Sequence, residues 1–320
     1  MTTSKQHNKE KESEKRVSEM LKTAFGPTIN TLLDDPTVTN IRLNPNGKLF
    51  YKKLKEGKFL SEESISKQSA EQIIRIVASS RGEICDSKNP IISSELPVTG
   101  YRFQGMLPPA VERASFAIRK KALLIYTLDD YVAQGILKPE WSEFIKKSIK
   151  EKKNILIVGG TDSGKTTFAN AVLSEIAAYN DTILIIEDTY ELQCNGNDVV
   201  IFRACDGVAD MQTLLKSALR FDPDRIIVGE VRGAEALTLL DSWNTGHPGG
   251  LSTVHANSAR QALRRIEQLV LQGSRHVSKQ MIADAVNVIV YIESDGIRRQ
   301  IKEVMEVTGL KEDYVLNQIK

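Results

Sequence analysis

The segment 155–167 reads ILIVGGTDSGKTT, an apolar run that leads into a glycine-rich loop ending in Lys165 and Thr166. The spacing from Gly159 onward is G-x-x-x-x-G-K-T, which is typical of a phosphate-binding loop between a strand and a helix. Backbone N–H groups of such a loop surround a phosphate at the N-terminus of the helix, where the helix dipole favours negative charge. The segment therefore predicts an α/β domain with a nucleoside triphosphate site.

The same spacing gives parts of the loop different tasks. Lys165 would reach the β- and γ-phosphates, and the Thr166 hydroxyl would be a ligand of a bound Mg²⁺. The loop backbone would hold the phosphates between them. The residues expected to bind the nucleotide are Gly159, Gly160, Thr161, Asp162, Ser163, Gly164, Lys165, Thr166 and Thr167.

The composition is that of an ordinary globular protein. A chain of 320 residues has room for two domains of about 100–200 residues each. The 43 basic and 41 acidic residues leave a net charge of +2, so no overall field indicates a nucleic-acid partner. Three widely spaced cysteines support neither a disulfide framework nor a zinc site. Since the N-terminus is charged and no apolar run approaches ~20 residues, we expect a cytoplasmic protein that meets a membrane only peripherally or through partners.

The pattern of the chain changes near residue 120. Before it, helical spacing at 17–24, an Asn-Pro-Asn-Gly turn at 44–47 and short strands broken by proline indicate a small α+β unit. After it, Thr127 with Asp130 resembles a helix cap, and Pro139 suits the first turn of a helix. We expect a disordered or frayed N-terminus at 1–16, an α+β N-terminal domain at 17–120, a linker at 121–135 and a P-loop domain at 136–320.

The second half of the chain alternates nearly continuous apolar runs with amphipathic helical patterns. Runs of this kind are typical of parallel strands that are covered on both faces. The fold class expected is therefore α/β, with a parallel sheet, preceded by the smaller α+β domain. The strands expected in the sheet are 155–158, 183–186, 226–228, 251–254 and 288–292.

Polar clusters follow four of these runs, and the carboxyl ends of parallel strands meet at one edge of a sheet, where ligands bind. Glu187 or Asp188 is placed to hold the Mg²⁺ shell or to orient water, although a helix-capping acid pair is the alternative. Glu230 is the better candidate for accepting the proton of the attacking water. His255 is a candidate γ-phosphate sensor, or else a hydrogen-bonded core histidine. His247 and His255 lack a third ligand at metal spacing, so zinc is not expected.

Four segments together resemble the Walker A, Asp, Walker B and His boxes of the ATPases of type II and type IV secretion systems. They are 159–167, 186–192, 220–233 and 245–256. The resemblance implies a RecA-like P-loop ATPase that uses ATP and Mg²⁺. It places the box positions of that superfamily on Glu187, Glu230, Arg232, His247 and His255, with Thr166, Glu187 and Glu230 around the metal and with Arg232 and His247 toward the nucleotide.

Within that superfamily the chain looks most like the TrbB-type conjugal transfer ATPases, over nearly all of residues 20–310. The resemblance implies a homo-hexamer on the cytoplasmic face of the bacterial inner membrane. Its expected partners are inner-membrane components of a type IV secretion apparatus, which it would power for channel assembly or substrate transfer, with no sequence-specific nucleic-acid binding of its own. It also implies that Arg102 and Arg119 contact the nucleotide phosphates as catalytic residues, where a guanidinium fork suits spread phosphate charge.

One position departs from the family pattern. The family has glycine at the fourth position of the loop, and this chain has Asp162. An acid there repels phosphate and adopts a left-handed backbone less readily than glycine, although Asp is among the residues that tolerate it. We expect weakened nucleotide binding. Two alternatives remain: a RecA-like ATPase that moves nucleic acid directly, and a nucleotide-gated scaffold in which Asp162 has slowed turnover.

Overall fold

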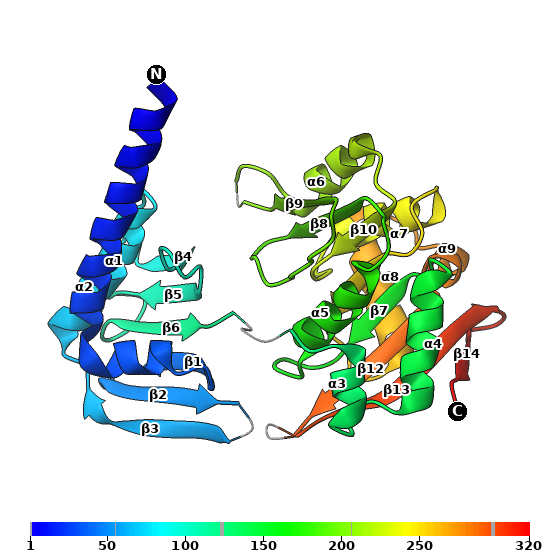
Figure 1. Cartoon of the computed structure of the whole chain (residues 1–320), viewed down its shortest axis with the longest axis horizontal. Coiled ribbons are helices and arrows are strands. Elements are labelled where there is room, and N and C mark those ends of the chain that lie inside the picture. The colour runs from blue at the N-terminus through cyan, green and yellow to red at the C-terminus, as the bar shows by residue number, and fades with distance from the viewer. Residues whose placement is uncertain (1, 55, 122–124, 206, 296–297) are drawn as a thin grey trace. The chain divides into compact units, whose positions relative to one another are not determined.

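A computed structural model describes residues 2–54, 56–121, 125–205, 207–295 and 298–320, with side chains from Lys15 onward. The chain forms two compact units, Met1–Leu123 and Leu124–Lys320 (Figure 1). Residue 1 of the expected N-terminal segment and residues 122–124 of the expected linker lie outside the described residues. Among the described residues, no helix has both the length and the hydropathy that crossing a bilayer requires.

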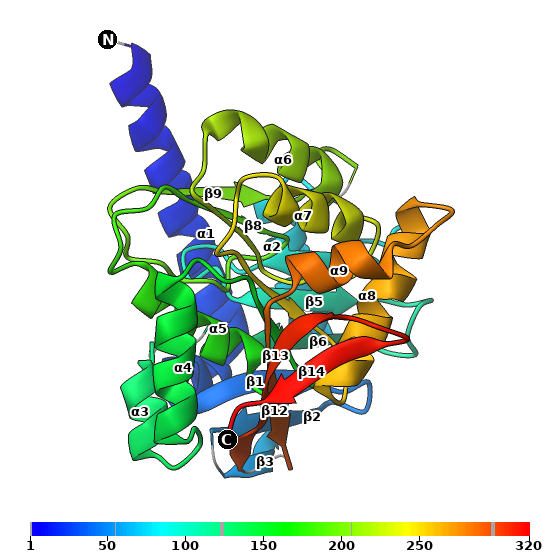
Figure 2. The same ribbon diagram turned by 90° about the vertical axis from the view of Figure 1, so that its right-hand side faces the viewer.

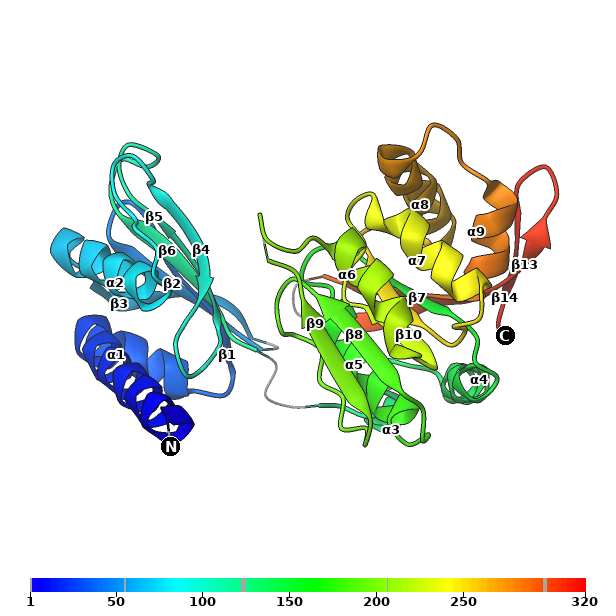
Figure 3. The same ribbon diagram turned by 90° about the horizontal axis from the view of Figure 1, so that it is seen from above.

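The first unit is an antiparallel sheet with two helices on one face (Figure 3). The strand order is β3-β2-β1-β6-β5-β4. The hairpin predicted around residues 44–47 is present, with Ile41 paired to Tyr51. The elements are α1 (Thr2–Asp34), β1 (Val38–Leu43), β2 (Lys48–Lys53), β3 (Gly57–Ser64), α2 (Lys67–Ser80), β4 (Ile91–Glu95), β5 (Arg102–Met106) and β6 (Ser115–Arg119).

Sequence spacing accounts for the core of this unit. The apolar face of α2 contributes Ile73, Ile74 and Val77, which are fully buried against the sheet. Helix α1 is two helical segments joined at Gly26, whose φ of 67° breaks the helix where the Gly-Pro pair predicts an end. Burial of these apolar faces, and not intrinsic helix propensity, supplies most of the stability of such elements.

The second unit contains an eight-stranded sheet in the order β14-β13-β12-β7-β11-β10-β8-β9. The strands from β12 to β9 in this order are parallel, and the predicted strands are all among them. The elements are α3 (Leu128–Ala133), α4 (Pro139–Lys150), β7 (Ile155–Val158), α5 (Lys165–Ile176), β8 (Ile183–Glu187), β9 (Val199–Arg203), α6 (Met211–Ala218), the 3₁₀ helix η1 (Leu219–Phe221), β10 (Arg225–Val228), α7 (Glu235–Asn244), β11 (Leu251–Val254), α8 (Ala259–Gly273), α9 (Lys279–Ala285), β12 (Val288–Ser294), β13 (Arg299–Leu310) and β14 (Tyr314–Gln318).

The sheet is mixed, whereas the sequence predicts a parallel sheet. Strand β13 pairs antiparallel with β12, and β14 pairs antiparallel with β13, which closes one edge of the sheet with a hairpin (Figure 2). In β13 the buried residues Ile301, Val304 and Val307 are three positions apart, and in β14 Tyr314 alone is buried. A search for continuous apolar runs therefore misses them.

Side-chain alternation puts a separate core on each face of this sheet. Leu156 and Val158 belong to the core formed with α6, α7, α8 and α9, whereas Ile155 and Ile157 belong to the core formed with α3, α4 and α5 (Figure 3). The predicted cap is present as a capping box of Thr127 and Asp130. Helix α3, which falls in the segment expected to be a linker, contributes the buried Leu128 and Tyr131 to the second core.

Candidate nucleotide site at the carboxyl edge of the second sheet

The phosphate-binding loop lies between β7 and α5, in the strand–loop–helix context that its sequence predicts. Gly164 is the N-cap residue of α5, with a φ of 98°. A Cβ on Gly159 would lie 2.4 Å from the carbonyl oxygen of Ile292, so only glycine fits there. Asp162 has a φ of 59°, in the left-handed region. The position where the family has glycine therefore has the backbone that glycine adopts most easily.

Lys165 begins the helix and its side chain turns back over the loop. Its Nζ donates to the carbonyl oxygens of Gly159 at 2.9 Å and Gly160 at 2.8 Å. The same ammonium lies 3.1 Å from Nδ1 of His255, and Lys165 is buried. The two carbonyls and His255 therefore hold the Lys165 ammonium over the loop.

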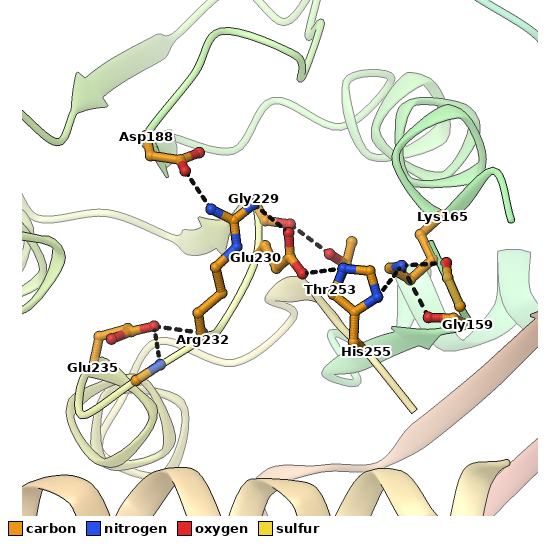
Figure 4. A network of polar contacts seen from close by, with 11 residues as sticks. Gly159, Lys165, Asp188, Gly229, Glu230, Arg232, Glu235, Thr253 and His255 are labelled. Atoms are coloured by element: carbon orange, nitrogen blue, oxygen red, sulfur yellow. Dashed lines mark hydrogen bonds and ion pairs between the residues drawn. The ribbon is translucent and has the colours of Figure 1, made fainter. Parts of the chain in front are cut away.

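His255 connects the lysine to the acid that follows β10 (Figure 4). Its Nε2 lies 2.8 Å from Oε1 of Glu230, and its Nδ1 faces the Lys165 ammonium. Partial burial and the Lys165 charge lower the pKa of His255, against the opposite effect of Glu230. A neutral ring with a lone pair on Nδ1 accepts from Lys165. The contact of Nε2 with Oε1 of Glu230 lacks hydrogen-bond geometry, so this buried oxygen has no hydrogen-bond partner in the described structure.

Glu230 and Arg232 extend these contacts along the sheet edge. Oε2 of Glu230 accepts from Arg232 at 2.6 Å, and the other end of the guanidinium donates to Asp188 at 2.5 Å. The order of these side chains is the order of the strands, because Lys165 follows β7, His255 follows β11, Glu230 and Arg232 follow β10, and Asp188 follows β8. A continuous polar chain thus crosses the carboxyl ends of four neighbouring strands (Figure 4). We call it the edge chain.

Glu235 also belongs to this site, although it was absent from the residues expected from sequence. Its Oε1 accepts from the backbone N–H groups of Arg232 at 2.6 Å and Gly233 at 2.8 Å, which fixes the turn that carries Arg232 (Figure 4). An acid in the first turn of a helix is a readable signal, because it stabilises the exposed N–H groups there. Glu235 therefore positions Arg232 through the backbone.

Glu187 ends β8 but is buried beneath the site, with 2% of its surface exposed. Its Oε2 accepts from the backbone N–H groups of Glu191 and Leu192, at 3.0 and 3.1 Å. Its Oε1 is buried and has no hydrogen-bond partner in the described structure. Burial raises the pKa of this carboxyl to about 7, and the two N–H groups oppose the shift. A cation is the kind of ligand that an orphaned buried carboxylate oxygen favours.

The residues present fit Mg²⁺ bound with a nucleotide better than a cage made of protein alone. Among the described residues, no group of three or more His, Cys, Asp or Glu could hold a metal ion. Mg²⁺ usually takes one or two protein oxygens together with phosphate oxygens and water. The protein oxygens predicted for it are those of Thr166, in the first turn of α5, and of Glu187 and Glu230, each of which has a buried carboxylate oxygen without a hydrogen-bond partner in the described structure.

His247 does not lie with the edge chain. Its Nδ1 is 2.7 Å from the carbonyl oxygen of Pro223, just before β10, whereas Glu230 follows the other end of that strand. The reason is topological, since His247 precedes β11 and His255 follows it, so the two histidines occupy opposite edges of the sheet. The structure thus places His247 apart from the edge chain, and its contact with the nucleotide stays a prediction.

Arg102 and Arg119 belong to the first unit, where they are direct cross-strand neighbours on β5 and β6. Like charges directly opposite one another destabilise a sheet unless an anion lies between or beside them. Glu95 lies opposite Arg102 across β4 and β5, and its carboxylate is a negative charge beside the two arginines. The two arginines therefore form a concentrated cationic pair on their own sheet.

The second unit combines an open, largely parallel sheet with a phosphate-binding loop and a polar edge chain, which defines it as a P-loop α/β protein. The family model described as "Type II/IV secretion system protein" matches residues 41–295. The chain belongs to this family of type II and type IV secretion system proteins.

Individual relatives agree with that assignment. The chain is 44% identical over 304 residues to the conjugal transfer protein TrbB of Rhizobium radiobacter, covering 94% of each protein. It is 30% identical over 282 residues to the type IV secretion system protein VirB11 of Bartonella henselae, covering 76% of this chain and 79% of the relative. These matches confirm the resemblance to TrbB-type conjugal transfer proteins that the sequence motifs predict.

A solved structure supports the fold. The Legionella pneumophila ATPase DotB superposes with a TM-score of 0.64 and 17% sequence identity, over 87% of this chain and 80% of that one. At this identity the likeness concerns the fold alone. The fold is therefore shared with that ATPase.

Proposed function

We propose that this chain is the ATP-hydrolysing motor of a conjugative type IV secretion apparatus, with a RecA-like second unit that acts in a ring of six copies. The observation that carries the proposal is the edge chain, which joins the P-loop lysine to Glu230 through His255. An open parallel sheet that gathers such side chains at its carboxyl edge is suited to binding a nucleotide there.

In this proposal the residues of the edge chain exchange partners when nucleotide binds. Lys165 leaves the carbonyls of Gly159 and Gly160 for the β- and γ-phosphates. His255 then faces the γ-phosphate, and Glu230 accepts the proton of the attacking water while Arg232 holds its other oxygen. A bound Mg²⁺ would neutralise developing phosphate charge, held by Thr166 and by Glu187 directly or through water.

Arg102 and Arg119 are proposed to supply further positive charge that contacts the nucleotide phosphates. Their cross-strand pairing in the first unit supports this, because it places two arginines directly opposite each other on neighbouring strands. An arginine acting on the transferred phosphate is worth about 10³–10⁵ in rate. In the proposal, Arg102→Ala and Arg119→Ala lower hydrolysis strongly while light scattering shows the same assembly; unchanged hydrolysis in both variants rejects it.

The proposed setting is the cytoplasmic face of the inner membrane, with inner-membrane components of the secretion apparatus as partners. The similarity to a conjugal transfer protein and to a type IV secretion system protein supports this choice. Light scattering of the full chain with and without Mg-ATP tests the ring, since six copies are expected when nucleotide is present. A monomer under both conditions rejects it.

The catalytic proposal is tested by phosphate release from Mg-ATP. Lys165→Ala should lower the rate by at least about 10²-fold, because it removes the charge that meets the β- and γ-phosphates. Lys147→Ala is the matched control, since that lysine is 71% exposed on α4, and it should keep the full rate. Normal turnover in Lys165→Ala rejects the site.

The same assay separates the two alternative functions. A chain that moves nucleic acid directly would show hydrolysis stimulated by single-stranded DNA, with a steep salt dependence. A nucleotide-gated scaffold would bind Mg-ATP without releasing phosphate above the Lys165→Ala background. DNA-independent turnover supports the secretion motor.

A further inference from the structure

Arg299 begins β13, and its side chain packs directly against the phosphate-binding loop. A Cβ on Gly164 would lie 3.0 Å from Cδ and 3.1 Å from Nε of Arg299. Burial raises the pKa of the Tyr131 hydroxyl, and the positive charge of Arg299 acts in the opposite direction, so the guanidinium also lies near that hydroxyl. The side chain is half-buried beside the loop.

The charge of Arg299 lacks the compensation that other arginines of this unit have. Arg225 is paired with Asp181, Arg232 with Glu230 and Asp188, and Arg260 with Asp313. Across the described part of the unit, the structure shows no carboxylate within ion-pair distance of Arg299. A half-buried guanidinium is most stable with an anion, and the loop beside it has the backbone geometry of an anion site.

The sheet order shows which side of the loop Arg299 occupies. Strand β12 neighbours β7 on one side, and β13 follows it outward, whereas β11 and β10 lie on the other side of β7. His255 and Glu230 come from β11 and β10, so the reacting end of the nucleotide faces that side. Arg299 approaches from the opposite side, next to the N-terminus of α5.

We propose that Arg299 is a nucleotide-positioning residue that binds the phosphates common to ADP and ATP, on the side of the loop opposite the edge chain. The inference deepens the proposed function and rests on it. The guanidinium would contact the α- or β-phosphate together with the backbone N–H groups that begin α5. It would hold the nucleotide in place without contacting the transferred γ-phosphate.

The test uses the full-length protein and calorimetric titration with Mg-ADP and with a non-hydrolysable Mg-ATP analogue. Arg299→Gln keeps most of the stem over Gly164 and removes the charge. Both ligands should bind about tenfold more weakly, by the same factor, because one charge-assisted contact is lost. In steady-state hydrolysis of Mg-ATP, KM should rise while kcat stays within about twofold, as expected for uniform binding.

Two further variants distinguish a specific phosphate contact from a general loss of positive charge. Arg299→Lys restores the charge and should recover part of the affinity. Arg298→Ala removes an exposed arginine one residue earlier and should bind both ligands as the unmodified chain does. The difference between Arg299→Gln and the unmodified chain should shrink at high salt, since an electrostatic contact is screened.

Unchanged affinities in Arg299→Gln overturn the inference, as does an equal loss in Arg298→Ala, which would indicate a general field. Loss of binding to the ATP analogue alone overturns the assignment to the shared phosphates. A structural role would be indicated instead if Arg299→Gln loses thermal stability, Arg299→Lys fails to recover it, and the ratio of KM to kcat does not change. If the unmodified chain binds neither ligand, the proposed function itself fails.

Discussion

The two edges of the second sheet are built from the same strands but use charge in opposite ways. At the amino edge, Arg225 is 1% exposed and its guanidinium is fully engaged, with Asp181 at 2.6 Å and the carbonyls of Gly249 and Ile149 at 3.1 and 3.0 Å. At the carboxyl edge, His255 is 46% exposed on its side chain and lies between Lys165 and Glu230.

The difference separates a structural arrangement from one that can change partners. A buried, fully hydrogen-bonded arginine gains nothing by moving, and its loss leaves unpaired groups behind. The edge chain instead joins side chains through contacts that an incoming phosphate can replace. Two glycines near His247 are part of the structural arrangement at the amino edge. A Cβ on Gly249 would lie 2.6 Å from Arg225, and one on Gly250 would lie 2.0 Å from the Trp243 indole nitrogen.

The largest effect is expected at the carboxyl edge. Glu230→Gln preserves the shape of the side chain and its contact with His255 but removes the proton acceptor, so turnover should fall about 10²–10⁴-fold. Mg-ATP affinity and the free energy of unfolding should change little. Single-turnover hydrolysis and titration check this, with the exposed Glu312→Gln as control. Lost binding with a preserved residual rate would instead indicate that Glu230 is chiefly a metal ligand.

The amino edge should show the reverse behaviour. Arg225→Ala should lower the free energy of unfolding by about 3–5 kcal/mol, because Asp181 keeps Lys152 but loses its buried partner. The carbonyls of Gly249 and Ile149 also lose their donor. The protein that remains folded should hydrolyse ATP at a rate close to normal. Urea unfolding measures the loss, and Arg260→Ala, which removes an exposed pair with Asp313, should cost less than about 1 kcal/mol. Equal losses in the two variants would remove the distinction between the edges.

The sequence predicts the parts of this molecule that depend on local pattern. Gly159 and Lys165 lie where the loop motif requires, and the apolar runs at 155–158 and 226–228 are strands. Strand β9 was missed because it is a short, half-exposed strand at the sheet edge. Strands β13 and β14 were missed because few of their positions are buried.

The contacts within the site depend on long-range order, which a single sequence does not specify. The pairing of His255 with Glu230 follows from β11 lying beside β10, and motif spacing alone does not give the order of strands. The same limit explains His247, since a motif that spans a strand joins residues at opposite edges. The burial of Glu187 depends on its packing beside Gly229, where a Cβ would lie 3.1 Å from that of Glu187.

Glu187 combines features of the two edges, because it lies at the carboxyl edge but is buried like Arg225. Its substitution therefore tests whether burial or position at the edge decides the effect on stability. Its pKa is raised to about 7, above the ordinary 4.5, so the folded state holds a proton that the unfolded chain releases first. Stability without nucleotide should therefore be greatest below pH 4.5, as far as this group is concerned, and should fall as pH rises toward 7.

Glu187→Gln should remove this dependence and leave the protein up to about 3 kcal/mol more stable than the unmodified chain at pH 8, with little difference near pH 5. Hydrolysis should fall, since the proposed metal oxygen is lost. Denaturant unfolding at a series of pH values measures the effect. A pH profile identical to that of the unmodified chain would mean that Glu187 is not a destabilising buried acid.

The smallest predicted effect is at Asp162, the loop position where the family has glycine. Its side chain is exposed, so solvent screens its repulsion of a bound phosphate to about 1 kcal/mol. Its φ of 59° adds a conformational cost that glycine avoids. Asp162→Gly should therefore bind Mg-ATP about fivefold more tightly, and the gain should shrink at high salt.

Asp162→Asn separates the two causes, because it removes the charge and keeps a side chain that tolerates the left-handed region. If repulsion dominates, the asparagine variant should match the glycine variant at low salt. If backbone strain dominates, only the glycine variant should bind more tightly, and salt should not matter. Titrations of Mg-ATP at two salt concentrations distinguish these outcomes. Equal or tighter binding by the unmodified chain would mean that Asp162 is tolerated or useful, and that the departure from the family pattern does not weaken the site.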